Sequence, residues 1–328
     1  MAKDNIVLVI GVTGGMGSET ALAFSRRGFR IRALHRRPKE AASQFNHLNF
    51  DWVKGDAMEA TGVAAAAEGA RFIVHGANPP MYRNWPKLVL PMLENTIAAA
   101  RASGARILFP GTVYNFPPDA PMVLRENTPQ RATTRKGAIR IEMERRLEEA
   151  QATGVRSLIL RAGDFFGPHI TGNSWFRQLV KPGRPVRTIT YPGPPDIGHS
   201  WAYLPDIGET MALLAERDAR LAGFEVVHFG GHWFERGIDM AEAIRAVVAD
   251  PHLPIRSMPW WVVGAASPFV PLMRELWEIR YLWHVPMRLD NTKLVSILGD
   301  EPHTPTEEAV RASLTGLACL SAKSRSPA

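Results

Sequence analysis

The sequence predicts an α/β fold, in which a doubly wound parallel sheet is joined to a smaller, mostly helical lobe. Short β-rich runs alternate with helical stretches through the first half of the 328 residues. Strands that alternate with helices pair in parallel through right-handed crossovers. A glycine-rich turn follows the first run, and after residue 167 the alternation gives way to a segment rich in Pro, Gly and aromatic residues.

The individual elements are predicted from runs of β-branched and aromatic residues for strands and from longer mixed stretches for helices. The expected strands span residues 5–11, 29–36, 48–56, 71–77, 105–111, 155–163 and 224–231. The expected helices span residues 18–28, 38–45, 58–70, 85–103, 136–153, 205–216, 240–249 and 270–283. Gly28, Gly104 and Gly154 stand where the residue after a helix belongs. Ligands of such sheets bind at the carboxyl ends of the strands.

Composition bounds the class of protein. The chain is 45% hydrophobic and 22% charged, with a formal net charge of +7. Its Lys and Arg residues are scattered and are not interleaved with stacking aromatics, so we expect no nucleic-acid binding and instead a phosphorylated small molecule. A single cysteine, Cys319, and a start that leads directly into a strand indicate a reducing, cytoplasmic location.

The apolar stretch 259–273 (PWWVVGAASPFVPLM) is shorter than a membrane-spanning helix and is interrupted by three prolines. We interpret it as a wall of the substrate pocket or a buried helix, with contact to a membrane surface as the alternative.

The turn GVTGGMG indicates a dinucleotide site. It places Gly11, Gly14 and Gly17 after a strand and before a helix, where glycines let a pyrophosphate approach the first amides of the helix. The expected contacts are Gly11, Thr13, Gly14, Gly15, Met16 and Gly17. The second strand ends in Arg36 and Arg37 rather than a carboxylate, which favours the 2′-phosphate of NADP over the free ribose of NAD.

Several motifs together resemble the extended short-chain dehydrogenase/reductases, the group of nucleotide-sugar epimerases and dehydratases. They are GVTGGMG, KGD at 54–56, HGAN at 75–78, TVYN at 112–115, RAGDFFGP at 161–168 and WAYLPDIGETMALL at 201–214. The resemblance implies a Rossmann sheet formed by residues 1–168 and 200–231 and a substrate lobe formed by 169–199 and 232–328. It also implies that Asp56, Ala57, Gly76 and Ala77 contact the cofactor.

The catalytic residues of that family are replaced here. In the register of the resemblance, the Tyr and Lys of its Y-x-x-x-K motif fall on Lys136 and Arg140, and its Ser falls on Pro110, next to Thr112. The chain is therefore identified as an atypical member. Arg140 is expected to bind the nicotinamide ribose. Lys136 is crowded by Arg140 and a helix N-terminus, which predicts a lowered pKa. The proton donor is Lys136 or Tyr114, or the protein is not catalytic.

The expected substrate is an apolar or aromatic carbonyl compound or its alcohol. The family's phosphate-binding arginine is missing, since no arginine stands between Arg187 and Trp201. The lobe instead supplies aromatic residues: Trp175, Phe176, Trp201, Trp260, Trp261, Trp277 and Trp283. The alternatives are an NADP-binding regulator that senses redox state and a nucleotide-sugar epimerase or dehydratase. Histidine spacing predicts no metal site, and the helices at 85–103 and 136–153 are those by which the family often forms homodimers.

Overall fold

A seven-stranded parallel sheet forms the centre of the chain. The computed structural model describes residues 5–45, 49–79, 84–172 and 174–320. The sheet has the order β11-β7-β5-β4-β1-β2-β3, and all its pairings are parallel. Its strands are β1 (Ile6–Ile10), β2 (Arg30–His35), β3 (Asp51–Lys54), β4 (Phe72–His75), β5 (Arg106–Gly111), β7 (Arg156–Arg161) and β11 (Phe224–His228). This order is that of a doubly wound sheet.

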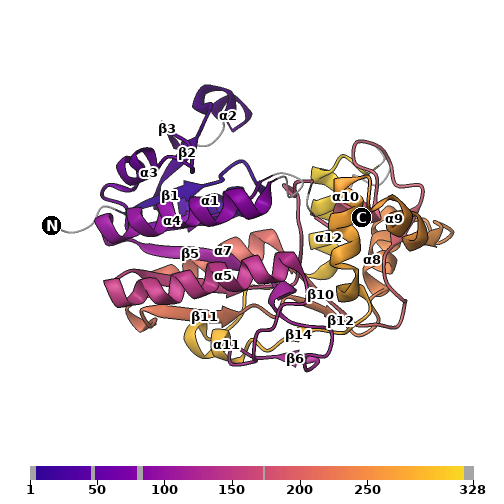
Figure 1. The fold of residues 1–328 in the computed structure, drawn as a ribbon. Coiled ribbons are helices and arrows are strands. Elements are labelled where there is room, and N and C mark those ends of the chain that lie inside the picture. The colour runs from indigo at the N-terminus through magenta and orange to yellow at the C-terminus, as the bar shows by residue number, and fades with distance from the viewer. Residues whose placement is uncertain (1–4, 46–48, 80–83, 173, 321–328) are drawn as a thin grey trace.

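Helices cover both faces of the sheet (Figure 1). One face carries α1 (Gly15–Arg26) and α7 (Leu204–Glu216), and the other carries α3 (Ala60–Ala67), α4 (Trp85–Ser103) and α5 (Arg135–Ala150). The short helix α2 (Pro38–Gln44) lies at the β2–β3 edge and α11 (Thr292–Leu298) packs near β11. The central strand β1 reads as a continuous apolar run, because helices exclude water from both faces of the sheet there.

The expected α/β fold is confirmed, and so are its seven strands in the main sheet. Residue 48, at the start of one predicted strand, lies outside the described residues. Gly28, Gly104 and Gly154 have φ of 78°, 67° and 80°, the left-handed conformation expected of the residue that follows a helix.

A second lobe lies at the carboxyl ends of the strands (Figure 1). Its helices are α6 (Phe176–Leu179), α8 (Asp239–Val248), α9 (Trp260–Ala266), α10 (Pro271–Glu278) and α12 (Thr306–Gly316). Its strands are β6 (Val123–Leu124), β8 (Asp164–Phe166), β9 (Ile189–Tyr191), β10 (His199–Tyr203), β12 (His232–Phe234), β13 (Ile255–Ser257) and β14 (Arg288–Leu289). The sequence pattern predicted none of these seven strands. The sheet β12-β10-β8 joins the lobe to the end of β7.

The aromatic residues of the lobe divide between its core and its surface. Trp175, Trp201 and Trp283 are buried, and their rings meet edge to face. In contrast, Trp261 is 78% exposed and α9 buries only Val263. The interpretation of 259–273 as a buried helix is therefore wrong for its outer side, because α9 packs on the lobe through one face only.

The contact between α1 and α7 depends on glycine. Gly208 lies inside α7, and a methyl group there would stand 2.6 Å from the carbonyl oxygen of Glu19 on α1. The two helices thus approach closely enough that no larger residue fits without a shift. Gly62 lies inside α3, where the nearest atom to an added methyl group is 3.9 Å away.

We expect Gly208→Ala to lower the free energy of unfolding by about 1–3 kcal/mol, the usual cost of overpacking. Gly62→Ala is the matched control, since alanine is favoured over glycine in helices by up to about 1 kcal/mol. Urea unfolding of both variants measures the difference. Equal effects of the two substitutions would contradict the close approach of α1 and α7.

Candidate functional site

The glycine turn between β1 and α1 lies where the predicted site requires it. Gly11 has φ of 89°, and a methyl group on it would meet the carbonyl carbon of Gly76 at 2.6 Å. A methyl group on Gly17 would stand 2.2 Å from the carbonyl oxygen of Gly11. Only glycine fits at either position. The first amides of α1, which have no partner inside the helix, are thereby presented to a ligand at the carboxyl edge of the sheet.

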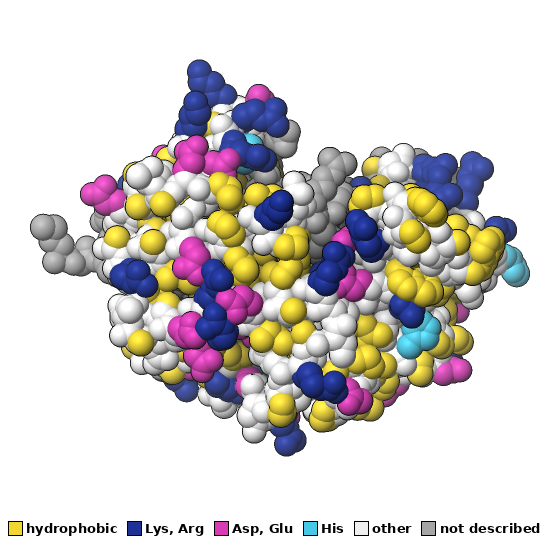
Figure 2. Space-filling view, viewed as in Figure 1, with side chains coloured by type: hydrophobic (Ala, Val, Ile, Leu, Met, Phe, Trp, Pro, Cys, Tyr) yellow, Lys and Arg dark blue, Asp and Glu magenta, His cyan; other side chains and the backbone are white. Residues whose placement is uncertain are grey.

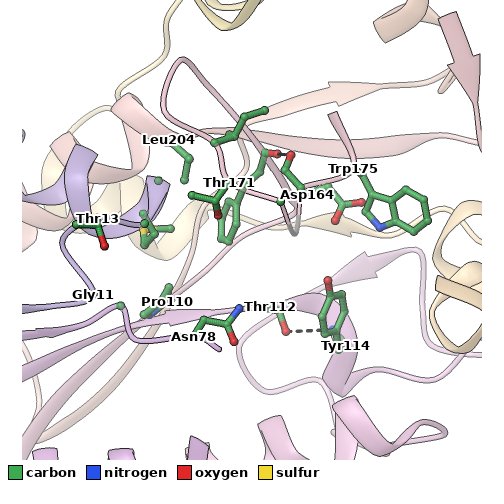
Figure 3. A pocket seen from close by; sticks show the side chains of 18 of the residues that line it. Gly11, Thr13, Asn78, Pro110, Thr112, Tyr114, Asp164, Thr171, Trp175 and Leu204 are labelled. Carbon is green, nitrogen blue, oxygen red and sulfur yellow. Dashed lines mark hydrogen bonds between the residues drawn. The ribbon is translucent and has the colours of Figure 1, made fainter. Parts of the chain in front are cut away.

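A cavity of about 330 Å³ opens against this turn. Figure 3 shows Thr112 and Tyr114 on one side and Asp164 and Trp175 on the other, with the hydroxyl group of Tyr114 directed toward the space between them. Its described lining is Gly11, Thr13, Gly14, Gly15, Met16, Gly76, Asn78, Pro110, Thr112, Tyr114, Arg140, Asp164, Phe165, Ile170, Thr171, Gly172, Ser174, Trp175 and Leu204.

Arg140 reaches this cavity from the second turn of α5. Its guanidinium donates to the carbonyl oxygen of Pro110 at 3.2 Å and lies 5.3 Å from the centre of the Trp85 ring. It also lies 5.5 Å from the ring of Phe109. The cation is therefore oriented along the end of β5, at the wall of the cavity.

Lys136, one helical turn earlier, is directed elsewhere. Its ammonium group lies 3.0 Å from a carboxylate oxygen of Glu275 and donates to the Glu275 carbonyl at 2.8 Å. The residue is 2% exposed and is not in the cavity lining. Burial lowers the pKa of Lys136, while Glu275 opposes the shift. The direction agrees with the expectation from sequence, but its main cause is burial rather than crowding by Arg140.

A buried ion pair holds the loop that carries Thr112 and Tyr114. Arg161, at the end of β7, lies 2.6 Å from Glu144 of α5 and donates to the Thr112 carbonyl at 2.6 Å. Both side chains are at most 5% exposed. Glu144 also accepts from Asn115 at 2.9 Å. The backbone amide of Tyr114 then donates to the Thr112 hydroxyl oxygen at 3.4 Å, so the loop has a defined shape beside α5.

The other predicted cofactor residues surround the same edge of the sheet. Arg36 and Arg37 follow β2 and are exposed, and Arg37 pairs with Glu40 at 2.8 Å. Asp56 follows β3 and accepts from the amide of Met58 at 3.0 Å. Ala57 also follows β3, Gly76 and Ala77 follow β4, and of these three only Gly76 lines the cavity. Contact of these residues with a cofactor stays a prediction.

Asp164 and His199 form a pair that sequence reasoning missed. Asp164 lines the cavity, and its carboxylate lies 2.8 Å from Nε2 of His199. His199 stacks on Trp283 with ring centres 4.0 Å apart. One signal was available, because Asp164 follows directly after the predicted strand 155–163, at its carboxyl end. The partner comes from β10, beside β8 in the smaller sheet.

A comparison with protein families agrees with this geometry, in which a glycine turn and a cavity lie at the carboxyl ends of a doubly wound sheet. The model of the family described as "NAD dependent epimerase/dehydratase family" matches residues 7–228. The chain belongs to this family. Its members are enzymes that use a nicotinamide cofactor. Membership confirms the expected family and the expectation that the protein is an enzyme.

Solved structures show the same fold at low sequence identity. A nucleoside-diphosphate-sugar epimerase from Pseudomonas aeruginosa is 17% identical over 95% of this chain and 97% of its own, with a TM-score of 0.73. A UDP-glucuronic acid 4-epimerase from Bacillus cereus, solved with UDP-glucuronic acid and NAD, is 15% identical over 95% and 99%, with a TM-score of 0.73. No curated protein has a significantly matching sequence.

Two further observations concern the described part of the chain. Within it, no helix combines the length and the apolar character that crossing a membrane requires. The same residues contain no group of three or more His, Cys, Asp or Glu side chains placed to hold a metal ion.

His75 lies at the end of β4, close enough to Arg140 to feel its charge. It is 2% exposed and its Nδ1 lies 2.8 Å from the Thr96 hydroxyl. Burial, followed by the charge of Arg140, lowers the pKa of His75 from 6.5 to about 3. The folded protein therefore keeps His75 neutral where the unfolded chain takes up a proton. Its contribution to stability is complete above pH 6.5 and is lost as the pH falls toward 3.

We expect His75→Gln to reduce the acid sensitivity of the protein. Between about pH 6.5 and pH 5, the variant should lose about 2 kcal/mol less unfolding free energy than the wild type, at about 1.4 kcal/mol per pH unit. Urea unfolding at several pH values measures the slope. His252→Gln, at an exposed position, is the control. An unchanged slope in His75→Gln would show that His75 is not held neutral.

Proposed function

We propose that this protein is an NADP-dependent oxidoreductase that interconverts an apolar carbonyl compound and its alcohol. The observation that carries the proposal is the character of the cavity beside the glycine turn. Its wall includes Met16, Phe165, Ile170, Trp175 and Leu204, and it contains the Tyr114 hydroxyl group. Such a wall binds an apolar ligand by burial, and a few polar groups orient it.

The residues present fit a nicotinamide dinucleotide. Gly11 and Gly17 let the turn pack closely on Gly76 and on itself, and this tight turn presents the first amides of α1 to a pyrophosphate. Arg140 lines the same cavity and supplies several donors in one plane, which suits the hydroxyl groups of a ribose. Hydride transfer is the chemistry that the bound cofactor supplies.

Tyr114 is the proton donor that the geometry favours. It lines the cavity, and its loop is fixed by the pair of Arg161 and Glu144. A general acid must lie within hydrogen-bond reach of the reacting oxygen. Lys136 meets this requirement less well, since its ammonium group already pairs with Glu275 away from the described cavity lining.

A nucleotide-sugar epimerase or dehydratase is the second candidate. It is favoured by family membership and by the structural neighbours, several of which were solved with UDP-sugars and NAD. A diphosphate binds best to arginine or lysine. The described lining contains one cation, Arg140, and also the carboxylate of Asp164, which would repel a diphosphate. The second lobe thus favours an uncharged substrate over a sugar diphosphate.

The proposal also covers the cellular location, the oligomeric state and the alternative of a regulator. The single cysteine favours a cytoplasmic location. A homodimer would form through α4 and α5, which are joined by an ion pair of 2.7 Å between Glu94 and Arg146. If NADPH binds but no carbonyl compound is reduced, the protein is a redox-sensing regulator instead.

We expect NADPH to bind about tenfold or more tightly than NADH, because a hydrogen bond to a charged group contributes about 1.5–3 kcal/mol. The double variant Arg36→Ala with Arg37→Ala should lose this preference. Lys39→Ala removes one charge from the neighbouring helix and should keep it. Fluorescence titration of these three proteins with NADPH and with NADH measures the six affinities, and equal binding of NADH and NADPH to the wild type would contradict the NADP preference.

We expect Tyr114→Phe to lower the turnover of an aromatic or alicyclic ketone by about a hundredfold, the usual contribution of a positioned general acid, with NADPH affinity unchanged. Tyr191→Phe removes a buried hydroxyl group outside the described cavity lining and should have little effect. NADPH oxidation is followed by absorbance. A hundredfold loss in Lys136→Met but not in Tyr114→Phe would assign the donor to Lys136.

A further inference from the structure

The pair of helices α9 and α10 carries an apolar surface that no described part of the chain covers. Trp261 is 78% exposed, Phe269 is 83% exposed, and Val262 and Val270 are 40% and 42% exposed. These four account for half of the eight large apolar side chains that the structure describes as exposed. The exposed apolar surface is thus concentrated on one helical hairpin rather than scattered singly over the molecule.

The hairpin is held rigidly, so the exposure is built in. Gly264 of α9 lies against Trp277 of α10, where an added methyl group would stand 2.9 Å from the indole ring. Arg280 lies 3.7 Å from the centre of the same ring. On the inner side, Trp260 donates to the Pro192 carbonyl at 2.6 Å and packs edge to face on Trp175, which lines the cavity. The neighbouring Trp261 is thereby turned outward.

The charged residues between Asp250 and Glu275, on and beside this surface, are all positive. No Asp or Glu occurs between Asp250 and Glu275, and the two charged residues in that interval are Arg256 and Arg274, both exposed. Glu275 itself pairs with Lys136 and Arg135. Figure 2 shows basic side chains around the yellow surface of this lobe.

We propose that α9 and α10 dock the protein on an anionic lipid surface. Exposed Trp and Phe side chains with flanking arginines are the composition of a helix that lies in the membrane interface, with apolar rings below the headgroups and cations beside the phosphates. Two copies of this surface would bring like charges together, which disfavours a dimer formed through it. The segment is too short to span a membrane, so the protein lies on the surface.

Docking on lipid does not depend on the proposed function. The hairpin adjoins the cavity wall through the contact of Trp260 with Trp175. One consequence rests on the proposed function: an apolar substrate dissolved in the membrane would be held close to the cavity. Vesicle binding is measured without turnover, so the two proposals fail separately.

The test is sedimentation of the full chain with vesicles of phosphatidylcholine alone or mixed with phosphatidylglycerol, at low and high salt. We expect binding to the anionic vesicles that weakens with salt. The double variant Trp261→Ser with Phe269→Ser should bind at least tenfold more weakly. Arg256→Gln with Arg274→Gln should lose the preference for anionic vesicles. Met58→Ser with Met122→Ser, which changes exposed apolar residues outside the hairpin, should bind as the wild type does.

All variants should keep wild-type NADPH binding and thermal stability, which separates lost docking from lost folding. No binding to anionic vesicles at low salt would overturn the proposal. So would equal binding by the Trp261 and Phe269 double variant. A concentration-dependent dimer of the wild type that this double variant abolishes would assign the surface to a second copy of the chain and would also overturn it.

Discussion

The buried pair of Arg161 and Glu144 is the interaction on which the rest of the site depends. Burying two charges costs several kcal/mol each, and their attraction offsets this only when further hydrogen bonds satisfy them. Here Arg161 also donates to the Thr112 carbonyl, and Glu144 accepts from Asn115 and Gln130. The pair therefore joins the end of β7, the loop after β5 and the inner face of α5. Removing one partner would leave the other charge buried without its counter-charge, at a cost of about 3–5 kcal/mol.

The wall that carries Arg140 and Tyr114 follows from this connection. Arg140 stands one turn before Glu144 on α5, so fixing the helix also fixes the position of its guanidinium against Pro110. Tyr114 stands on the loop that Arg161 holds. The opposite wall is formed by the segment after β7, where β8 pairs with β10 and so brings Asp164 to His199. A change in the Arg161–Glu144 network would therefore move Arg140 and Tyr114 together.

Features encoded over a few neighbouring residues could be predicted from the sequence. The central strand β1 is a continuous apolar run, and the three glycines at 11, 14 and 17 follow directly after it. Contacts between distant segments could not be predicted. The orientation of Lys136 is decided by Glu275, which lies 139 residues later in the chain. The pair of Asp164 and His199 joins strands of three and five residues, too short for alternation to reveal. The stretch 259–273 is apolar on every side, so its periodicity does not show which face is buried.

The central claim is that one cavity, bounded by the glycine turn, the loop after β5 and α5, receives the nicotinamide half of a dinucleotide. Hydrogen exchange of the full chain with and without NADPH tests it most directly, because amides that a ligand covers or orders exchange more slowly. The account predicts protection in peptides that contain 11–17, 110–115 and 135–140, with no change in 259–274. Protection limited to the glycine turn, or strongest in the second lobe away from residues 110–115, would contradict it.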